Sequence, residues 1–129
     1  MSSTERRIVV TGIGWVTPMG HDIETVWQRL LNGETNITPI ERFDARTFPT
    51  TFASQIRDYD WTGFVKDPAI NGEPGKHTQF ALGAARQAWT MSGLDDAANL
   101  NPHRVGIYLG AGEGVLDFQS YQKTSLASR

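Results

Sequence analysis

The clearest hydrophobic pattern in the 129-residue chain falls on residues 22–33. Its apolar residues are spaced three or four positions apart, as they are on one face of an α-helix. They are Ile23, Val26, Trp27, Leu30 and Leu31. Asp22 is a preferred N-cap residue, and Gly33 supplies the left-handed conformation that commonly ends a helix. The pattern therefore predicts a helix between Asp22 and Gly33.

Runs of consecutive apolar residues indicate strands elsewhere in the chain. Ile8, Val9 and Val10 form one run and residues 105–109 another, and each leads into a glycine-containing stretch. Such runs are typical of strands that are covered on both faces of a sheet. A shorter strand is predicted around residues 52–56, where the side chains alternate.

A second helix is predicted to begin near Thr78, whose hydroxyl can cap it, and to end at Gly93. The preceding residues 66–76 are rich in proline and glycine and predict an exposed loop. The helix is crowded with small residues. Gly83 in its interior costs about 1 kcal/mol relative to alanine, so we expect another element to approach the helix closely there.

The order strand, helix, weak strand, loop, helix, strand predicts an α/β fold with a largely parallel sheet. A sheet covered on both faces needs more strands and helices than these elements provide. The sequence is therefore expected to be part of a larger fold.

Composition narrows the functional classes. Hydrophobic residues make up 39% of the chain and the net charge is −2, which indicates a globular protein and gives no reason to expect a nucleic-acid partner. The absence of cysteine removes disulfides, thiolate metal sites and a cysteine nucleophile. The first apolar run is too short for a signal peptide or a membrane span. We expect a cytoplasmic protein that uses no cofactor or metal and binds no membrane.

The first glycine-containing stretch raises the question of a nucleotide site. Gly12 and Gly14 fit the start of a dinucleotide fingerprint, but Thr17 replaces its third glycine. The helix begins only near Asp22, too late to place its N-terminus on a pyrophosphate. A turn whose glycines allow close backbone packing is the favoured interpretation, and a nucleotide-binding oxidoreductase is the remote alternative.

The second glycine-rich stretch, at residues 110–114, contains Glu113. A charged residue at the end of a buried strand lies where α/β sheets usually bind ligands, although an exposed loop glutamate is the commoner arrangement. The three histidines are scattered without the spacing of metal ligands: His21, His77 and His103. The residues by themselves indicate no catalytic constellation.

Taken together, these stretches resemble the N-terminal part of the β-ketoacyl-acyl-carrier-protein synthases, and among them the elongating condensing enzymes of type II fatty acid synthesis. The resemblance lies in four segments and covers nearly the whole chain. They are RRIVVTGIGWVTPMG at 6–20, VWQRLLNGETNITPIERFD at 26–44, SGL at 92–94 and RVGIYLGAGEG at 104–114.

The resemblance implies part of a thiolase-like fold with α-β-α-β-α layers. On this interpretation residues 1–129 are part of the N-terminal β-ketoacyl synthase domain, truncated before the catalytic cysteine. Family members are homodimers that take an acyl chain from acyl carrier protein onto that cysteine and then condense it with decarboxylated malonyl-carrier protein. The cysteine and the two catalytic histidines lie beyond Arg129 in the family, so this chain carries no catalytic residue and is expected to be inactive alone.

The resemblance also places Glu113 near the acyl pocket, where the family usually has an apolar or small side chain. Glu113 is therefore the candidate substrate-binding residue. A second possibility within the family is a non-catalytic partner subunit of the chain-length-factor kind, which works only in a heterodimer.

Overall fold

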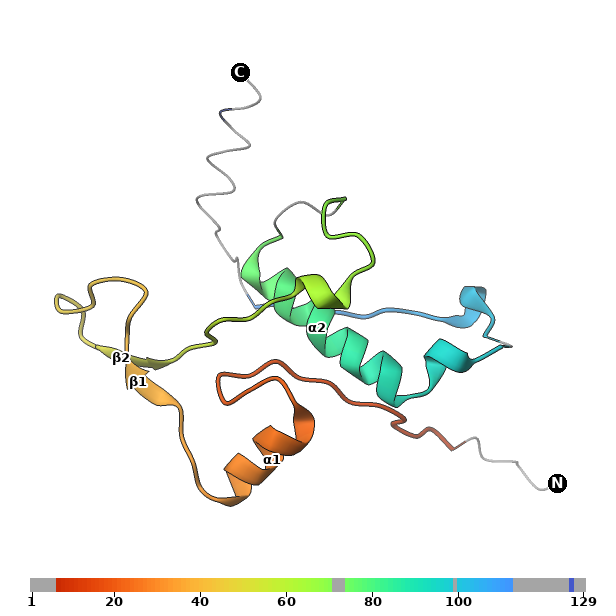
Figure 1. Cartoon of the computed structure of the whole chain (residues 1–129), viewed down its shortest axis with the longest axis horizontal. Helices are drawn as coiled ribbons and strands as arrows, with labels where there is room; N and C mark the ends of the chain where they lie inside the picture. The colour runs from red at the N-terminus through yellow and green to blue at the C-terminus, as the bar shows by residue number, and fades with distance from the viewer. Residues whose placement is uncertain (1–6, 71–73, 99, 113–125, 127–129) are drawn as a thin grey trace.

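The computed structural model describes residues 7–70, 74–98, 100–112 and 126. Two helices and a two-stranded sheet form the regular structure of these residues (Figure 1). The helices are α1 (Ile23–Leu31) and α2 (Lys76–Met91), and the strands are β1 (Ile37–Pro39) and β2 (Phe52–Ser54). Three single 3-10 turns accompany them: η1 (Thr62–Phe64), η2 (Leu94–Asp96) and η3 (Pro102–Arg104).

Helix α1 confirms the first prediction. The Asp22 carboxylate accepts the Thr25 backbone N–H at 2.8 Å, and hydrogen bonding to the Thr25 side chain and then to its backbone lowers the pKa of Asp22. Gly33 takes the left-handed conformation, with φ +69°. Only Val26 of the apolar stripe is fully buried, and Trp27 is half exposed. The amphipathic pattern thus forms the helix, but the described residues cover only part of its apolar face.

Strands β1 and β2 form an antiparallel hairpin that projects at the left of Figure 1. Thr38 pairs with Ala53 at its centre, and the Ile40 N–H donates to the Thr51 carbonyl at 2.9 Å. The strand predicted at residues 52–56 is confirmed in its first three residues. Its partner was not predicted because three residues that end in proline give no alternating pattern.

The strands predicted at residues 8–10 and 105–109 are not formed in the part of the chain that the structure describes. Both segments are extended, and Ile8 and Ile107 are 97% and 80% exposed. Consecutive apolar residues favour a strand, but a strand also needs a neighbour to bond with. The sheet among the described residues is antiparallel, so the expected largely parallel sheet is not present there.

Helix α2 begins two residues before the predicted start. Its N-cap is Gly75, whose carbonyl accepts the Thr78 N–H at 2.9 Å, and Thr78 therefore does not cap the helix. The buried Gln79 side chain instead holds the entering chain by donating to the Pro74 carbonyl at 2.7 Å. The left-handed Gly93 follows the helix, as predicted.

Helix α2 contacts η1, η2 and the first glycine stretch. Residues 12–16 run along it, and a Cβ on Gly12 or Gly14 would overlap the carbonyl oxygens of Ala88 and Ala84 respectively. The Tyr59 hydroxyl and a Val16 methyl group lie against Gly83, which confirms the predicted close approach. The glycines of the first stretch therefore serve backbone packing, as the favoured interpretation held.

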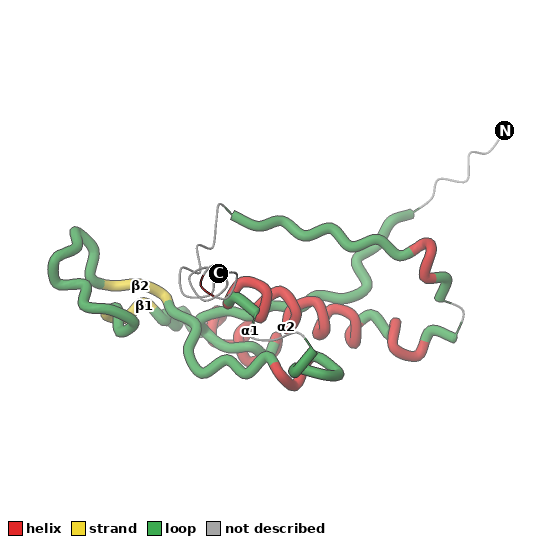
Figure 2. Tube along the Cα trace, turned by 90° about the horizontal axis from the view of Figure 1, so that it is seen from above, coloured by secondary structure: helices red, strands yellow, loops and turns green. Residues whose placement is uncertain are grey.

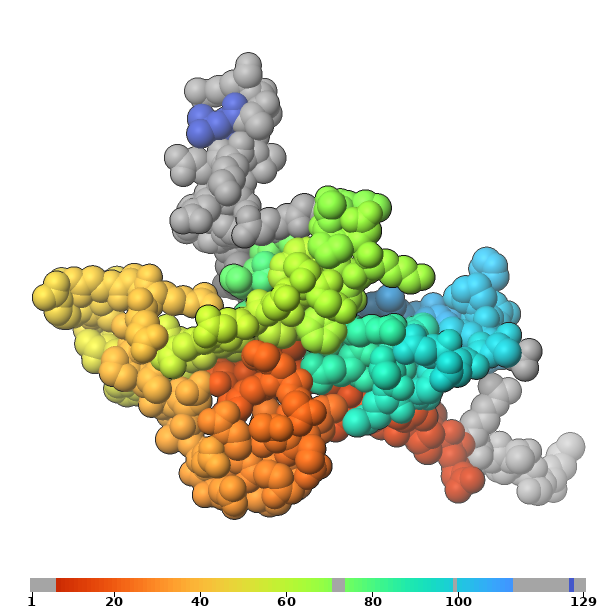
Figure 3. All heavy atoms as spheres, in the orientation of Figure 1, coloured from red at the N-terminus to blue at the C-terminus, as the bar shows by residue number. Residues whose placement is uncertain are grey.

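The arrangement is open. Figure 2 shows the hairpin at one end of the molecule and the turns that follow α2 at the other, and Figure 3 shows the hairpin standing away from α1 and α2. Buried apolar side chains among the described residues are few: Val26, Ala45 and Trp61. Neither described helix is long and apolar enough to cross a membrane.

Candidate functional site

Glu113, the predicted substrate-binding residue, lies outside the described residues. In the described part of its glycine-rich stretch, a Cβ on Gly110 or Gly112 would meet no atom of the described residues within 4 Å. The role of Glu113 therefore stays a prediction.

The structure does not bring the three histidines together. His77 lies in the exposed first turn of α2, His103 in η3, and His21 beside the start of α1. Within the described ranges, no group of three histidine, aspartate or glutamate side chains is placed to hold a metal ion.

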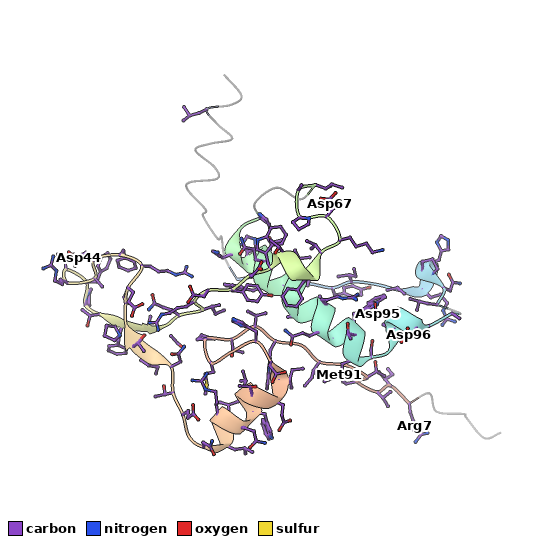
Figure 4. All side chains as sticks on the ribbon, viewed as in Figure 1. Arg7, Asp44, Asp67, Met91, Asp95 and Asp96 are labelled. Carbon is purple, nitrogen blue, oxygen red and sulfur yellow. The ribbon has the colours of Figure 1, made fainter. Side chains whose placement is uncertain are left out.

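A groove of about 790 Å³ lies between the start of α1 and the second half of α2. It was not predicted, because it depends on how two helices separated by more than forty residues lie together. Its lining residues are His21, Asp22, Ile23, Glu24, Phe64, Arg86, Gln87, Thr90 and Met91. In Figure 4, Met91 marks the end of α2, and Asp95 and Asp96 lie in the turn that follows the helix.

Most polar side chains along this groove already have partners, and the Nδ1 of His21 is the exception among those described. Asp22 caps α1, and Glu24 accepts a hydrogen bond from Gln28. Arg86 and Thr90 both donate to the Asp95 carboxylate, at 2.8 and 3.1 Å. These interactions join α2 to the turn that follows it, and they occupy groups that a ligand would otherwise use.

Gln87 lines the groove and connects α2 to the first glycine stretch. Its amide nitrogen donates to the Trp15 carbonyl at 3.0 Å, while its amide oxygen accepts the Trp15 N–H at 3.5 Å. One turn farther along α2, the Met91 sulfur accepts the Ile13 N–H at 3.4 Å. A side-chain amide thus supplies the two hydrogen bonds that a neighbouring strand would give to Trp15.

A tight turn at residues 17–20 leads from this segment into α1. The backbones of Thr17 and Gly20 exchange hydrogen bonds of 3.0 and 3.1 Å, and Gly20 has φ +141°. Arg29 of α1 donates to the Met19 carbonyl, and Asn36 donates to the Pro18 carbonyl. Thr17, Pro18 and Gly20 therefore form a turn that side chains of α1 and of the loop after it hold in place.

Tyr59 is the centre of an aromatic cluster beside the groove. Its ring meets His21 edge to face at 4.7 Å between centroids and Phe80 at 5.5 Å. Burial, and to a lesser degree the nearby Asp60 charge, raises the pKa of Tyr59. Its hydroxyl and the His21 Nδ1 are buried without a hydrogen-bond partner among the described residues.

Comparison with known protein families identifies the family to which these glycine stretches and helices belong. The family described as "Beta-ketoacyl synthase, N-terminal domain" matches residues 5–129. The matched region includes the glycine turn, both helices and the second glycine-rich stretch. This agrees with the resemblance found in the sequence.

Individual relatives give the same answer. The chain is 43% identical over 110 residues to "3-oxoacyl-[acyl-carrier-protein] synthase 2" of Coxiella burnetii, and the aligned region covers 85% of this chain and 26% of that protein. It is 38% identical over 114 residues to the Vibrio harveyi protein of the same name, and that alignment covers 88% of this chain and 27% of the relative. It is 35% identical over 115 residues to "3-oxoacyl-[acyl-carrier-protein] synthase I, chloroplastic" of Hordeum vulgare, covering 86% and 25%.

The chain spans about a quarter of the length of these relatives. Its match to the family extends over almost all of its own residues. The described structure supplies a physical reason for Gly12, Gly14 and Gly83 and for the Thr-Pro turn within that match. The chain belongs to the β-ketoacyl synthase family, and its sequence corresponds to the N-terminal domain of that family.

Proposed function

We propose that the chain provides the N-terminal part of a 3-oxoacyl-[acyl-carrier-protein] synthase. Such an enzyme takes an acyl group from acyl carrier protein, forms an acyl thioester and condenses it with the carbanion released by decarboxylation of malonyl-carrier protein. The observation that carries the proposal is the 43% identity to a synthase of that name over 110 residues.

The contribution of this chain to the reaction is structural. Because the sequence contains no cysteine, the acylated nucleophile must come from elsewhere in the enzyme. The described residues supply a glycine segment fixed on α2 by Gln87 and a turn fixed by Arg29. We propose that this unit forms part of a thiolase-like layered fold in a homodimeric, cytoplasmic enzyme.

A chimera tests the proposal. Residues of the Coxiella burnetii relative that match this chain are replaced by those of this chain, and condensation of acyl- and malonyl-carrier protein is assayed. We expect the chimera to condense the two substrates, whereas this chain alone gains no acyl adduct by mass spectrometry. A folded chimera without condensing activity, or an acyl adduct on the isolated chain, would contradict the proposal.

The chimera also tests Glu113. We propose that its carboxylate shortens or polarises the acyl pocket, because an unpaired charge is unfavourable beside an apolar chain. The variant Glu113→Ile is then expected to accept longer saturated acyl groups, measured as acylation rates across chain lengths. Glu24→Gln, a change in an exposed glutamate of α1, is the matched control. An unchanged chain-length profile for Glu113→Ile would remove this residue from the pocket.

A further inference from the structure

The residues that follow α1 form a closed helix end. The Gly33 N–H donates to the Leu30 carbonyl at 3.0 Å, and the next N–H, that of Glu34, donates at 3.0 Å to the carbonyl of Arg29. With Gly33 in the left-handed conformation, these two bonds form the Schellman arrangement that satisfies the last carbonyls of a helix. Asn32 keeps helical backbone angles, with φ −77° and ψ −2°. The backbone of the Asn32–Gly33 pair is therefore held by the end of the helix.

Side chains strengthen the same helix end. The Arg29 Nε donates to the Glu34 carboxylate at 2.8 Å, and Arg29 also donates to the Met19 carbonyl in the turn before α1. The hydrogen bond from Arg29 is the main reason that the pKa of Glu34 is lowered, and a weaker hydrogen bond from Asn32 adds to it. Arg29 therefore connects the end of α1 to the turn at its start.

An asparagine followed by glycine can change covalently without an enzyme. The backbone nitrogen of the glycine attacks the side-chain amide carbon, ammonia leaves, and water then opens the resulting succinimide to aspartate or isoaspartate. Glycine favours ring closure because it has no Cβ in the way. Asn32 and Gly33 are both exposed, and a Cβ on Gly33 would meet no atom of the described residues within 4 Å. The pair therefore has the water and the open space that the reaction needs.

The closed helix end keeps the two reacting atoms apart. Ring closure needs the Gly33 nitrogen to approach the Asn32 side chain, so ψ of Asn32 must leave its helical value of −2°. That nitrogen must also give up the proton that it donates to Leu30. Both requirements are met only when the last turn of α1 opens, and helix ends open at a small cost in free energy. We propose that Asn32 is a site of spontaneous deamidation and that the closed end of α1 controls its rate.

Both products fit this helix end less well than Asn32 does. A carboxylate at this position brings negative charge to the C-terminus of α1, where the helix dipole disfavours it, and it competes with Glu34 for Arg29. Isoaspartate lengthens the backbone by one methylene, which moves the Gly33 N–H away from its carbonyl partner. Either product weakens the hold of Arg29 on the Met19 carbonyl, so deamidation loosens the turn before α1.

Peptide mapping by mass spectrometry measures the modification directly. The chain is incubated at mildly alkaline pH with and without urea, and the conversion of the Asn32 amide to a carboxyl group is followed over time. We expect the reaction to be roughly tenfold or more slower without urea, because the helix end must open first. In urea, Asn71, which also precedes a glycine in the sequence, should react at a similar rate to Asn32. Equal rates at Asn32 with and without urea, or no reaction there in urea, would overturn the proposal.

Two glutamate variants test the side-chain contribution. Glu34→Ala removes the carboxylate that Arg29 binds, and should raise the rate at Asn32 about 1.5- to 5-fold without urea, as expected for an exposed ion pair. The ratio to the rate in urea corrects for any change in intrinsic reactivity. Glu41→Ala removes an exposed carboxylate that pairs with Arg57 at 3.1 Å, and this matched control should leave the rate unchanged. Equal ratios in the two variants would contradict control by this helix end.

Hydrogen exchange of the Gly33 amide shows whether the helix end is closed. This amide is protected only while it donates to Leu30, so its protection and the slowing of deamidation at Asn32 should agree. The comparison is made in this chain and in the Coxiella chimera. Protection without slowed deamidation would overturn the proposal, and so would an unprotected Gly33 amide in both proteins. Neither readout uses condensing activity, so the outcome is independent of the proposed function.

Discussion

The two glycine stretches of this chain look alike in sequence and differ in structure. Each follows a run of apolar residues and has glycines at alternate positions. Gly12 and Gly14 lie in contact with the backbone of α2, whereas a Cβ on Gly110 or Gly112 would have no neighbour within 4 Å among the described residues. The difference lies in the neighbour: α2 presents Ala84 and Ala88 to the first stretch. Glycine spacing alone therefore does not say whether a close approach exists.

The largest expected effect comes from filling the space at Gly14. Valine there would overlap the Ala84 carbonyl, and over-packing of this kind costs about 1–3 kcal/mol or more in the free energy of unfolding. We expect Gly14→Val to lower the urea midpoint of the chain, followed by circular dichroism. Gly112→Val is the matched control and should change stability by less than about 0.5 kcal/mol. Equal effects of the two variants would remove the distinction between the stretches.

A smaller effect is expected when the hydrogen bonds of the first stretch are removed. Gln87→Ala leaves the N–H and carbonyl of the part-buried Trp15 to water, and the loss of a hydrogen bond whose groups regain water costs about 0.5–1.5 kcal/mol. Gln28→Ala, which removes an exposed amide on α1, is the control. We expect faster hydrogen exchange at Trp15 only in the Gln87 variant, and unchanged exchange there would contradict the role given to this amide.

The smallest expected effect is at the N-cap of α1. The pKa of Asp22 lies below its ordinary value of 3.8 because of its hydrogen bond with Thr25. A lowered folded-state pKa means that the carboxylate stabilises the fold above pH 3.8 and that this contribution disappears as the pH falls through the lowered value. Asp22→Ala should reduce helix content at pH 7 and differ less from the parent in strong acid.

Asparagine provides the control for that pH dependence. Asp22→Asn keeps an oxygen that can cap the helix but does not titrate. Its helix content should therefore stay close to that of the parent at pH 7 and change less in acid. A parallel acid response of Asp22→Asn and the parent would mean that other carboxylates control the transition.

Local signals in the sequence predicted the elements that depend on local physics. The stripe around Val26, the Asp22 cap and the left-handed Gly33 concern contacts within a few residues, and all three are confirmed. The close approach at Gly83 was also predictable, because a glycine inside a helix needs a reason. The residue that contacts Gly83, Tyr59, was not predictable, since no local pattern indicates which distant side chain packs there.

Local signals could not show whether the segments at residues 8–10 and 105–109 pair as strands, nor that a groove forms between α1 and α2. Ile8 and Ile107 have the chemistry of buried strands, but burial depends on a neighbour that the pattern does not contain. The groove between α1 and α2 likewise follows from the packing of residues far apart in sequence. The site prediction at Glu113 depended on a family resemblance, and the described residues do not reach it.

The pairing of Trp15 with Gln87 has a consequence for how the protein is made. The two residues are separated by 72 positions, and a ribosome adds residues at about 5–20 per second. The first segment therefore waits roughly 4 to 14 s after its own synthesis before its helical partner exists. During that interval Ile8, Val9 and Val10 emerge as an unpaired apolar run, which is the kind of nascent segment that chaperones bind.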